Sequence, residues 1–486
     1  MKFRVSDVAT MSRRRFVAGA VAACAGATVA RADQGSHKFR QLDDKIMQGM
    51  QQFSIPGAAV VVICGGQTYI RGYGVTDLSN PQPVDGNTVF RVASNSKTFT
   101  GLSAMRLVDS GALSLEAQVN SYIHGFEAPP GAGPVSVRQV LNHSAGWLGY
   151  DYHDTGTDDR ALARYVHGVR DLPQLTPVGE VMSYNNAAIS VAGRVIETIT
   201  GTTFEASVRD LVFEPLGLAR SGFTVQDVGT ANFAAPHTVD ANGVTVADPS
   251  LFYLPRSNNP FGGVLSCAND LAAYLRFYLG NGCAAGGQRL LSEASLDGMW
   301  SDPGPGGTLE VELDGFGVSW MVRPTAQGPK VIQHGGDLPG YHSGLFFVPD
   351  KQFAMTLLTN AESGRSLIPQ LFAEDWALQL FAGLNNLPAT PQQLSPDQLA
   401  AYEGTYTNQE IGFTGPIEEQ TSQMAAAGGT LQFTIGTDAG TPANTLTFYK
   451  TDFVLAPKGY RANFLRDANG QVAWFRLGGQ LYRRQG

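Results

Sequence analysis

Apolar residues recur every three to four positions in several stretches of this chain, a spacing that predicts amphipathic helices. The clearest stretch ends at Gly201, a residue that often terminates helices, and another ends near Gly111. Pro215 marks the end of a third. The spacing predicts helices over residues 38–53, 94–113, 186–200, 204–213 and 366–383.

Shorter apolar runs predict strands at both ends of the first 384 residues. Residues 58–64 and 68–73 flank Gly65-Gly66, a typical hairpin turn. Three more short strands are expected over residues 331–333, 344–348 and 353–359. Strands at both ends with helices between them predict an α+β fold, in which one antiparallel sheet joins the two ends and helices flank it.

The last ninety or so residues have a different pattern. Residues 385–396 are rich in Pro, Asn and Gln, which is typical of a linker. Short alternating runs then follow, and Asn469-Gly470 is a strong hairpin signal. We therefore expect one large α+β domain over residues 38–384, a linker over 385–396 and a small all-β domain over 397–486.

Composition and charge narrow the classes of partner. The 486 residues are 43% hydrophobic and 16% charged, enough for a large core. Residues 1–32 hold six basic residues and one acidic residue, so the remainder carries a formal charge of −13, against −8 for the whole chain. This acidity argues against nucleic acid and anionic membranes as partners. The cysteines and histidines show no metal-ligand spacing, and we expect no metal and no cofactor.

The first 32 residues resemble an export signal. Arg13-Arg14-Arg15 precedes an apolar run over residues 17–30, and Ala30-Arg31-Ala32 resembles a signal-peptidase cleavage site. This predicts a twin-arginine signal and a periplasmic or secreted protein. Lipoprotein anchoring at Cys24 is the alternative. A membrane anchor is disfavoured because the apolar run is too short to span a bilayer, so the mature chain is expected to have no membrane span.

Ser94 and Lys97 form the one S-x-x-K in the chain. If Ser94 opens a helix, this spacing places both side chains on one face, one turn apart. An amine there can accept the hydroxyl proton, which makes the serine an acyl-accepting nucleophile. A bare S-x-x-K is expected about once by chance in a chain this long, so its significance depends on the rest of the sequence.

Two further segments carry candidate chemistry. Tyr184 and Asn186 stand at the start of the helix expected over residues 186–200, where a phenol and an amide can both point into a cleft. Core packing for Tyr184 and helix capping for Asn186 are the structural alternatives. His334-Gly335-Gly336 is expected to end a short strand, whose edge the glycines leave open to a substrate. A turn with an exposed histidine is the alternative.

Together these motifs resemble those of the penicillin-recognising serine hydrolases, which include class C β-lactamases, DD-peptidases, D-aminopeptidases and related esterases. The order S-x-x-K, Y-x-N and H-x-G carries the resemblance, with further similar segments around Leu141–Gly146 and Gly262–Ser266. It covers roughly residues 38–383 and implies a β-lactamase/transpeptidase-like fold with an all-helical insert. The residues from about 397 resemble the lipocalin-like β domain of some members.

The resemblance implies a role for each motif. Ser94 is the acylated nucleophile, and Lys97 and Tyr184 share the general-base and proton-relay work. Asn186 orients the substrate amide and Lys97, while His334 and Gly336 line the substrate site. The backbone N–H groups of Ser94 and Asp337 form the oxyanion hole. The implied activity is hydrolysis of an ester, amide or peptide bond in a small-molecule or peptide substrate.

His334 departs from the family pattern, which has a lysine there. A histidine has a reference pKa of about 6.5 and is mostly neutral at about pH 7.5. Losing a charged hydrogen bond to a substrate carboxylate costs about 1.5–3 kcal/mol. This favours substrates without a required free carboxylate, as in D-aminopeptidases and esterases, over a true class C β-lactamase or DD-carboxypeptidase.

Two other interpretations remain open. Ser144 carries the second half of a G-x-S-x-G nucleophile elbow, but its first glycine is missing and residues 137–141 predict a helical turn where a strand is needed. A non-catalytic penicillin-binding sensor on the same fold is the other possibility. An intact set of Ser94, Lys97 and Tyr184 argues against it, since a sensor need not keep all three.

Overall fold

The computed structural model describes residues 37–229, 232–436 and 443–485. The chain divides into two units, residues 1–52 and 53–486. The described part of the first unit is helical from residue 37 and buries Leu42, Ile46 and Met50, as the spacing predicted. The expected export signal over residues 1–32, with Cys24, lies outside the described residues. No described helix is both long and apolar enough to cross a bilayer.

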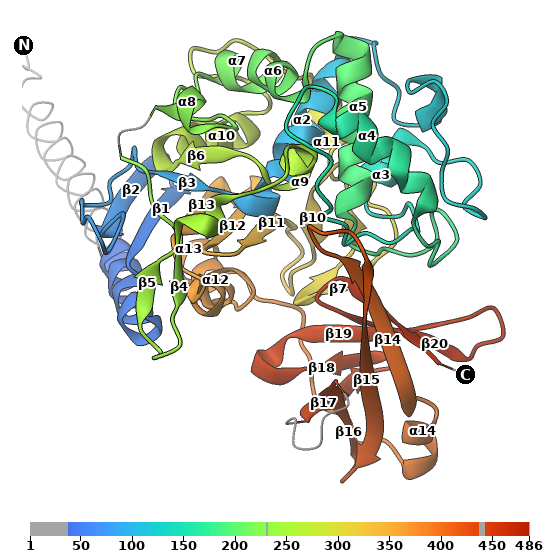
Figure 1. Cartoon of the computed structure of the whole chain (residues 1–486). Helices are drawn as coiled ribbons and strands as arrows, with labels where there is room; N and C mark the ends of the chain where they lie inside the picture. Colours follow the sequence, from blue (N-terminus) through green and yellow to red (C-terminus); the bar gives the residue numbers. More distant parts are fainter. Residues whose placement is uncertain (1–36, 230–231, 437–442, 486) are drawn as a thin grey trace, which may run out of the picture. The chain divides into compact units, whose positions relative to one another are not determined.

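A seven-stranded antiparallel sheet lies at the centre of the second unit (Figure 1). Its order, β2-β1-β13-β12-β11-β10-β9, pairs the N-terminal hairpin with the last strand of the sheet, which confirms the predicted joining of the two ends. The strands are β1 (Gly57–Cys64), β2 (Gln67–Gly74), β9 (Gly315–Phe316), β10 (Met321–Arg323), β11 (Val331–Leu338), β12 (Tyr341–Val348) and β13 (Phe353–Thr359).

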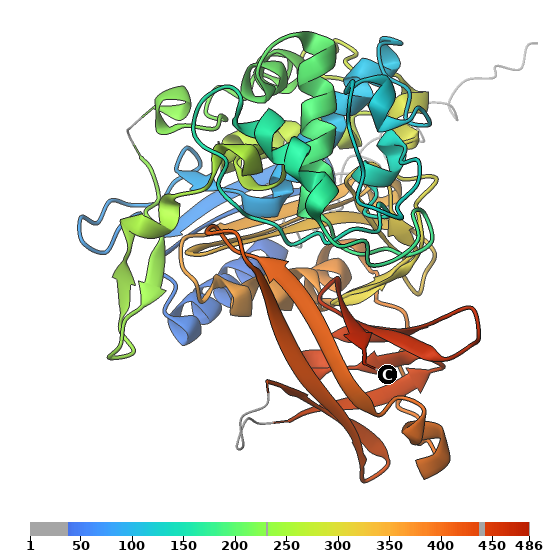
Figure 2. The ribbon, with the colours of Figure 1, turned by 45° about the vertical axis from the view of Figure 1, so that its right-hand side comes forward.

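Helices cover the sheet and form a separate helical region, visible in both Figures 1 and 2. On the sheet, α10 (Ala268–Leu279) contacts β1 and β13, and α12 (Gly364–Phe372) contacts β12. The helical region packs α5 (Asn186–Thr200) against its neighbours: α2 (Ser96–Asp109), α3 (Val137–Leu141) and α4 (Ala161–Gly168). The observed architecture is therefore the predicted α+β fold with a helical insert.

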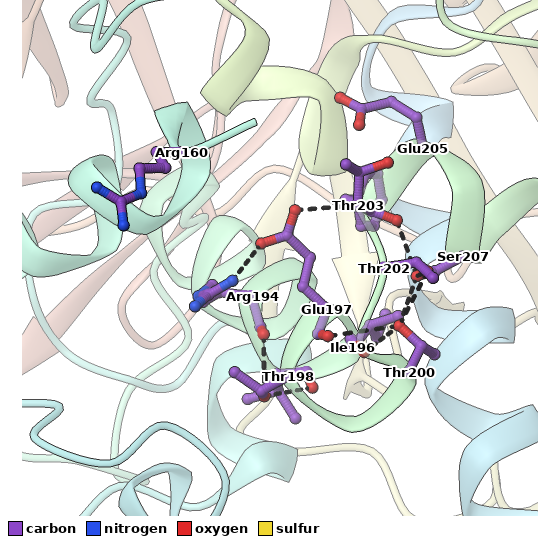
Figure 3. Close-up of polar contacts among 12 residues, drawn as sticks. Arg160, Arg194, Ile196, Glu197, Thr198, Thr200, Thr202, Thr203, Glu205 and Ser207 are labelled. Atoms are coloured by element: carbon purple, nitrogen blue, oxygen red, sulfur yellow. Dashed lines mark hydrogen bonds and ion pairs between the residues drawn. The ribbon is translucent and has the colours of Figure 1, made fainter. Parts of the chain in front are cut away.

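The end of α5 shows how one buried acid connects two helices (Figure 3). Gly201 adopts a left-handed φ of 72° and terminates α5, as predicted. Glu197 accepts a hydrogen bond from Arg194 at 2.8 Å and another from the backbone N–H of Phe204 at 2.9 Å. The second bond satisfies a donor at the start of α6 (Phe204–Val208).

The helix expected over residues 204–213 does not end before Pro215. It continues from α6 through a π-helical turn, η4 (Arg209–Phe213), into the short α7 (Glu214–Leu216). Pro215 is the second residue of α7 and directly follows the π-helical turn, where the hydrogen-bond pattern of the helix changes. Gly217, with a φ of 68°, terminates the helix.

The single helix predicted over residues 366–383 is also wrong, because the structure has two helices, α12 and α13 (Trp376–Ala382). The buried Arg323 of β10 donates hydrogen bonds to the carbonyl of Phe372 at 2.5 Å and to that of Ala373 at 3.1 Å. These carbonyls would otherwise continue the helical pattern, so a contact from a distant strand ends α12.

Residues 404–484 form a closed barrel of eight antiparallel strands, which confirms the predicted all-β region. Aromatic side chains such as Phe433, Phe464 and Phe475 fill its interior. A short helix, α14 (Pro396–Ala400), precedes it. The strands are β14 (Gly404–Ile411), β15 (Ile417–Ala427), β16 (Thr430–Ile435), β17 (Asn444–Lys450), β18 (Phe453–Leu455), β19 (Arg461–Arg466), β20 (Val472–Leu477) and β21 (Gln480–Arg484).

The barrel reaches the helical region through its longest hairpin, β14–β15, drawn in orange in Figure 2. Ile411 exchanges backbone hydrogen bonds with Tyr150 at 2.7 Å and Tyr152 at 2.9 Å, and Asp154 donates to the carbonyl of Phe413 at 3.2 Å. The barrel thus contacts the segment that carries two pocket tyrosines. Both belong to one compact unit, so the boundaries expected at residues 384 and 397 stay predictions.

Candidate active site

Ser94 and Lys97 meet at the start of α2, as the spacing predicted. Ser94 lies in a 3-10 turn, η1 (Ala93–Asn95), and Lys97 in the first turn of α2. Lys97 Nζ donates a hydrogen bond to Ser94 Oγ over 3.0 Å. Ala93 has a left-handed φ of 51°, unfavourable for a residue other than glycine. Such local strain next to Ser94 is typical of functional sites.

The Lys97 amine is held in surroundings that favour its uncharged form. Its side chain is fully buried, and Nζ also donates to the carbonyl of Phe261, in α9 (Asn259–Gly262), at 3.0 Å. Burial lowers the pKa of Lys97 well below its usual value, because the charged form loses hydration. No described carboxylate forms an ion pair with it. An uncharged amine at this position can accept the proton of Ser94.

Tyr184 lies beside Ser94 and Lys97. Its phenol is close enough to the Ser94 hydroxyl to interact with it, and its ring centroid is 4.8 Å from Lys97 Nζ. Burial raises the pKa of Tyr184 far above its usual value, so the phenol carries its proton at neutral pH. The ring of His143 stacks on that of Tyr184 at 4.5 Å and fixes its orientation.

Asn186 is buried at the start of α5, close to the pocket tyrosines. Its amide donates to the hydroxyl of Tyr152 at 3.0 Å, and its carbonyl oxygen accepts no hydrogen bond from the described residues. The hydrogen bonds of Lys97 Nζ go to Ser94 and Phe261. The capping residue of α5 is Asn185, whose side chain accepts the N–H of Ala188. The amide of Asn186 is therefore not used as a helix cap.

The His334-Gly335-Gly336 segment does not end its strand as predicted, because β11 continues to Leu338 and pairs with β12 along this length. His334 is 2% exposed, so the alternative of an exposed turn histidine is also wrong. A Cβ on Gly336 would lie 2.3 Å from the Val92 carbonyl and 3.1 Å from Ala93 Cβ. The glycine therefore lets β11 lie directly against the turn that carries Ser94.

His334 is uncharged in this environment. Burial and the nearby Lys97 lower its pKa to about 3. Its Nδ1 lies 2.6 Å from the carbonyl of Gly335, so Nδ1 carries the proton, and Nε2 has no partner among the described residues. The position that the family fills with a lysine cation is here a neutral imidazole with a free acceptor nitrogen.

The buried side chain of His342 holds the side chain of Asp337 in place. His342 of β12 forms ion pairs with Asp337 through Nδ1 and with Glu362 through Nε2, the latter at 3.6 Å. Burial alone would lower the pKa of His342, but these two carboxylates raise it. The Asp337 side chain remains 74% exposed. Its backbone N–H, an expected oxyanion donor, is thus on a strand anchored by the His342 ion pairs.

A pocket of about 450 Å³ opens above Ser94. Ser94, Tyr184, His334, Gly336 and Asp337 all line it. The sequence did not point to several other lining residues, which come from loops, from β12 and from the barrel: Tyr150, Tyr152, Glu310, Ser343, Lys458 and Tyr460. No short motif marks them, because tertiary packing alone brings them to the pocket.

The rival nucleophile Ser144 forms no hydrogen bond with a basic side chain among the described residues. It is 1% exposed, and its hydroxyl donates to Asn142 Oδ1 at 2.6 Å. The neighbouring His143 accepts the N–H of Asn185 at 2.8 Å through Nδ1. The helix α3 precedes Ser144, where a nucleophile elbow requires a strand.

Comparisons with known proteins agree with this geometry. The family model described as Beta-lactamase matches residues 42–374. Penicillin-binding protein 4 of Amycolatopsis lactamdurans is 31% identical over 357 residues, which cover 72% of this chain and 93% of that protein.

Two solved structures share the fold over most of the chain. The crystal structure of SurE has a TM-score of 0.69 at 22% identity, and SurE with D-Leu has a TM-score of 0.67 at 23% identity. Each alignment covers 93% of this chain and 100% of SurE. On the family match and the Amycolatopsis relative, this chain belongs to the beta-lactamase family of serine hydrolases.

Proposed function

We propose that this protein is an exported serine hydrolase that cleaves ester or amide bonds through an acyl-enzyme on Ser94, with D-aminopeptidase-like or esterase-like specificity. The observation that carries the proposal is the 3.0 Å contact between Ser94 Oγ and the buried Lys97 amine. This pair has the geometry of an activated nucleophile, and it opens onto a pocket large enough for a small substrate.

In the proposed acylation, Lys97 accepts the proton of Ser94 as Oγ attacks the substrate carbonyl. The oxyanion is stabilised by the backbone N–H groups of Ser94 and Asp337. The protonated Lys97 then returns its proton, through Tyr184, to the leaving amine or alcohol as the bond to the carbonyl carbon breaks. Water attacks the resulting ester in a second cycle of the same steps and releases the acid.

The neutral His334 supports substrates without a required free carboxylate. The family lysine would supply a permanent cation, while the imidazole here offers a hydrogen-bond acceptor. SurE, which shares the fold, has been solved with D-Leu. A β-lactamase or DD-carboxypeptidase activity is the alternative, and it depends on a cation that His334 does not provide.

Labelling with a fluorophosphonate probe tests the nucleophile. Wild-type protein and Ser144→Ala should be labelled on Ser94, whereas Ser94→Ala should lose both label and turnover. Turnover is measured with p-nitrophenyl esters, D-amino acid amides and nitrocefin. Tyr184→Phe should keep the fold and lose most of its rate. Turnover that persists in Ser94→Ala, or loss of labelling in Ser144→Ala alone, would refute the assignment.

Export is the second part of the proposal, supported by the arginine cluster ahead of the apolar run. The double variant Arg13→Lys, Arg14→Lys should leave uncleaved precursor in the cytoplasm. Cell fractionation with antibody detection measures this. Unchanged export of the double variant would show that the twin-arginine route is not used.

A further inference from the structure

Glu310 occupies an unusual place at the edge of the catalytic pocket. It is the single turn residue between β7 (Gly307–Leu309) and β8 (Val311–Leu313), and its φ of 58° is left-handed. A β-carbon makes this conformation unfavourable, and glycine is the usual residue there. Glu310 lines the pocket that contains Ser94. A strained turn with an acidic residue at the edge of a catalytic pocket suggests a functional role.

The hairpin is fixed on two sides, so the backbone of this turn is held in place. The backbone N–H of Arg461, in the barrel, donates to the Glu310 carbonyl at 2.9 Å. Val311 packs in one apolar cluster with Tyr184, and Leu309 packs against that cluster. Glu310 therefore lies beside the catalytic tyrosine, on a turn held between the barrel and the active site.

The surroundings of Glu310 differ from those of Glu312, two residues further on. Glu312 forms ion pairs with Lys450 and Arg461 of the barrel, and its side chain is 10% exposed. Glu312 does not line the pocket. The Glu310 carboxylate, in contrast, forms no hydrogen bond or ion pair with any described residue. On this hairpin, Glu312 therefore anchors the barrel, whereas Glu310 lines the pocket and its carboxylate has no partner among the described residues.

The charges around Glu310 define what it can bind. Asp337 of β11 repels its negative charge, Lys458 of the barrel attracts it, and Tyr460 lies nearby. Burial is the largest effect, and with Asp337 it raises the pKa of Glu310 to about 7. A positively charged group that binds in the pocket would stabilise the ionised carboxylate and offset the cost of its burial.

We propose that Glu310 binds a cationic group of the substrate, an ammonium or a guanidinium, and so selects amine-bearing esters or amides. The proposal rests on the function proposed above and names its substrate class. The neutral His334 offers a carboxylate no charge, while Glu310 and Asp337 both line the pocket, as do the cations Lys458 and Arg365. Arg365 is paired with Glu362, whereas the Glu310 carboxylate has no partner among the described residues and can form a charged hydrogen bond with a cationic substrate group.

The test compares matched substrates that differ only in charge. One pair is a p-nitroanilide of a D-amino acid with a free α-amine and its N-acetyl derivative. The other is the p-nitrophenyl ester of a straight-chain acid that ends in an amine and the ester that ends in a methyl group. The two pairs distinguish an α-amine from a side-chain amine. The readout is the ratio of kcat/KM for the charged substrate to that for the neutral one.

Glu310→Gln should lower this ratio about tenfold to a hundredfold for the pair that matches the natural substrate, because a charged hydrogen bond becomes a neutral one. The matched control is Glu312→Gln, the same change on the same hairpin, whose ratio should stay within about twofold of wild type. Lys458→Gln should raise the ratio, since it removes a competing cation. For the ester that ends in an alkyl amine, which stays charged in this range, the wild-type ratio should rise between about pH 6 and about pH 8 as the carboxyl group ionises, and this rise should be absent in Glu310→Gln.

A wild-type ratio near one for both pairs, or an equal fall for charged and neutral substrates in Glu310→Gln, would overturn the inference. Fluorophosphonate labelling of Ser94 in the same variant shows whether its catalytic centre is intact. If Ser94→Ala still hydrolyses the substrates, the proposed function itself fails. If hydrolysis depends on Ser94 but shows no charge selectivity, the function stands and the role of Glu310 is refuted.

Discussion

Lys97 Nζ lies 3.0 Å from Ser94 Oγ, in a position where the amine loses nearly all contact with water. The serine therefore faces a base whose uncharged form is favoured by burial. The proposed activity therefore requires that Lys97 is uncharged. In this role the amine accepts a proton, and a positive charge at the same position would not be enough.

Replacing Lys97 by arginine should abolish most activity, even though the positive charge is kept. Arginine cannot release its proton in a protein, so it cannot act as a base. We expect kcat to fall by about 10²–10⁴ in both Lys97→Arg and Lys97→Met. A wild-type rate in Lys97→Arg would show that only charge is needed.

The pH profile of the wild type checks the same point. The folded-state pKa of Lys97 is lowered, so the neutral amine is present above that value and is lost as pH falls through it. The rate should therefore already be high near neutral pH. A lysine with its reference pKa of about 10.4 would instead require strongly alkaline conditions. A rate that climbs steadily to about pH 10 would contradict the assignment.

Gly336 and Gly335 offer a matched pair on β11. A Cβ on Gly336 would lie 2.3 Å from both the Val92 carbonyl and Ser343 Oγ, whereas on Gly335 the nearest atom is 3.9 Å away. Gly336→Ala should push β11 away from the Ser94 turn and lower kcat about 10²-fold, since a displacement of about 1 Å has that effect. Gly335→Ala should have a much smaller effect. Equal rates in the two variants would refute this close approach.

The barrel contributes to the catalytic centre through the turn between β20 and β21. The Gly479 carbonyl accepts the N–H of Tyr184 at 3.0 Å, and a Cβ on Gly479 would lie 2.9 Å from Tyr184 Cβ. The same atom on Gly478 would meet nothing within 4 Å. Both glycines have positive φ, so both alanine variants share a strain of about 1–2 kcal/mol.

Only Gly479→Ala should therefore displace Tyr184. We expect its kcat to fall, with thermal melting temperatures lowered by similar amounts in the two alanine variants. Steady-state kinetics and melting curves measure these two effects separately. A fall in kcat of the same size in Gly478→Ala would indicate that backbone strain, and not the contact with Tyr184, is responsible.

Local patterns in the sequence correctly predicted structural features that depend on residues close together in the chain. Ser94 and Lys97 are one helical turn apart, and α5 ends at Gly201 because glycine tolerates a left-handed φ. Local patterns failed where contacts between distant residues decide the structure. Arg323 divides the helix expected over residues 366–383, and no pattern within that segment predicts this break.

The pocket also depends on long-range contacts that local sequence patterns do not predict. His334-Gly335-Gly336 resembled a strand end because glycines usually mark turns, but Gly336 is required for a close approach to Val92. Glu310 and Lys458 lie on separate hairpins almost 150 residues apart, and only the docking of the barrel brings both to the pocket of Ser94. Sequence motifs pointed to the proposed catalytic groups and did not point to Glu310 and Lys458, which line the same pocket.

His334→Lys should restore some recognition of carboxylate-bearing substrates. The gain in kcat/KM is expected to reach about tenfold to a hundredfold, the effect of a charged hydrogen bond. The structure changes the expected pH dependence of this gain. From the reference pKa of histidine, the gain would be largest above about pH 7. Because burial lowers the pKa of His334 to about 3, the histidine is neutral throughout the working range.

The gain should therefore be nearly constant between about pH 6 and about pH 8, because the carboxylate of the bound substrate favours the charged form of the new lysine. Salt should have little effect on it, because the side chain at this position is buried and ions screen buried pairs poorly. The measurement is kcat/KM for matched neutral and carboxylate-bearing esters, for both proteins, at two pH values and two salt concentrations. A gain that appears only above pH 7 would mean that His334 is protonated in acid and already binds carboxylates there. A wild-type enzyme that hydrolyses nitrocefin as fast as its best ester would show that His334 does not set specificity.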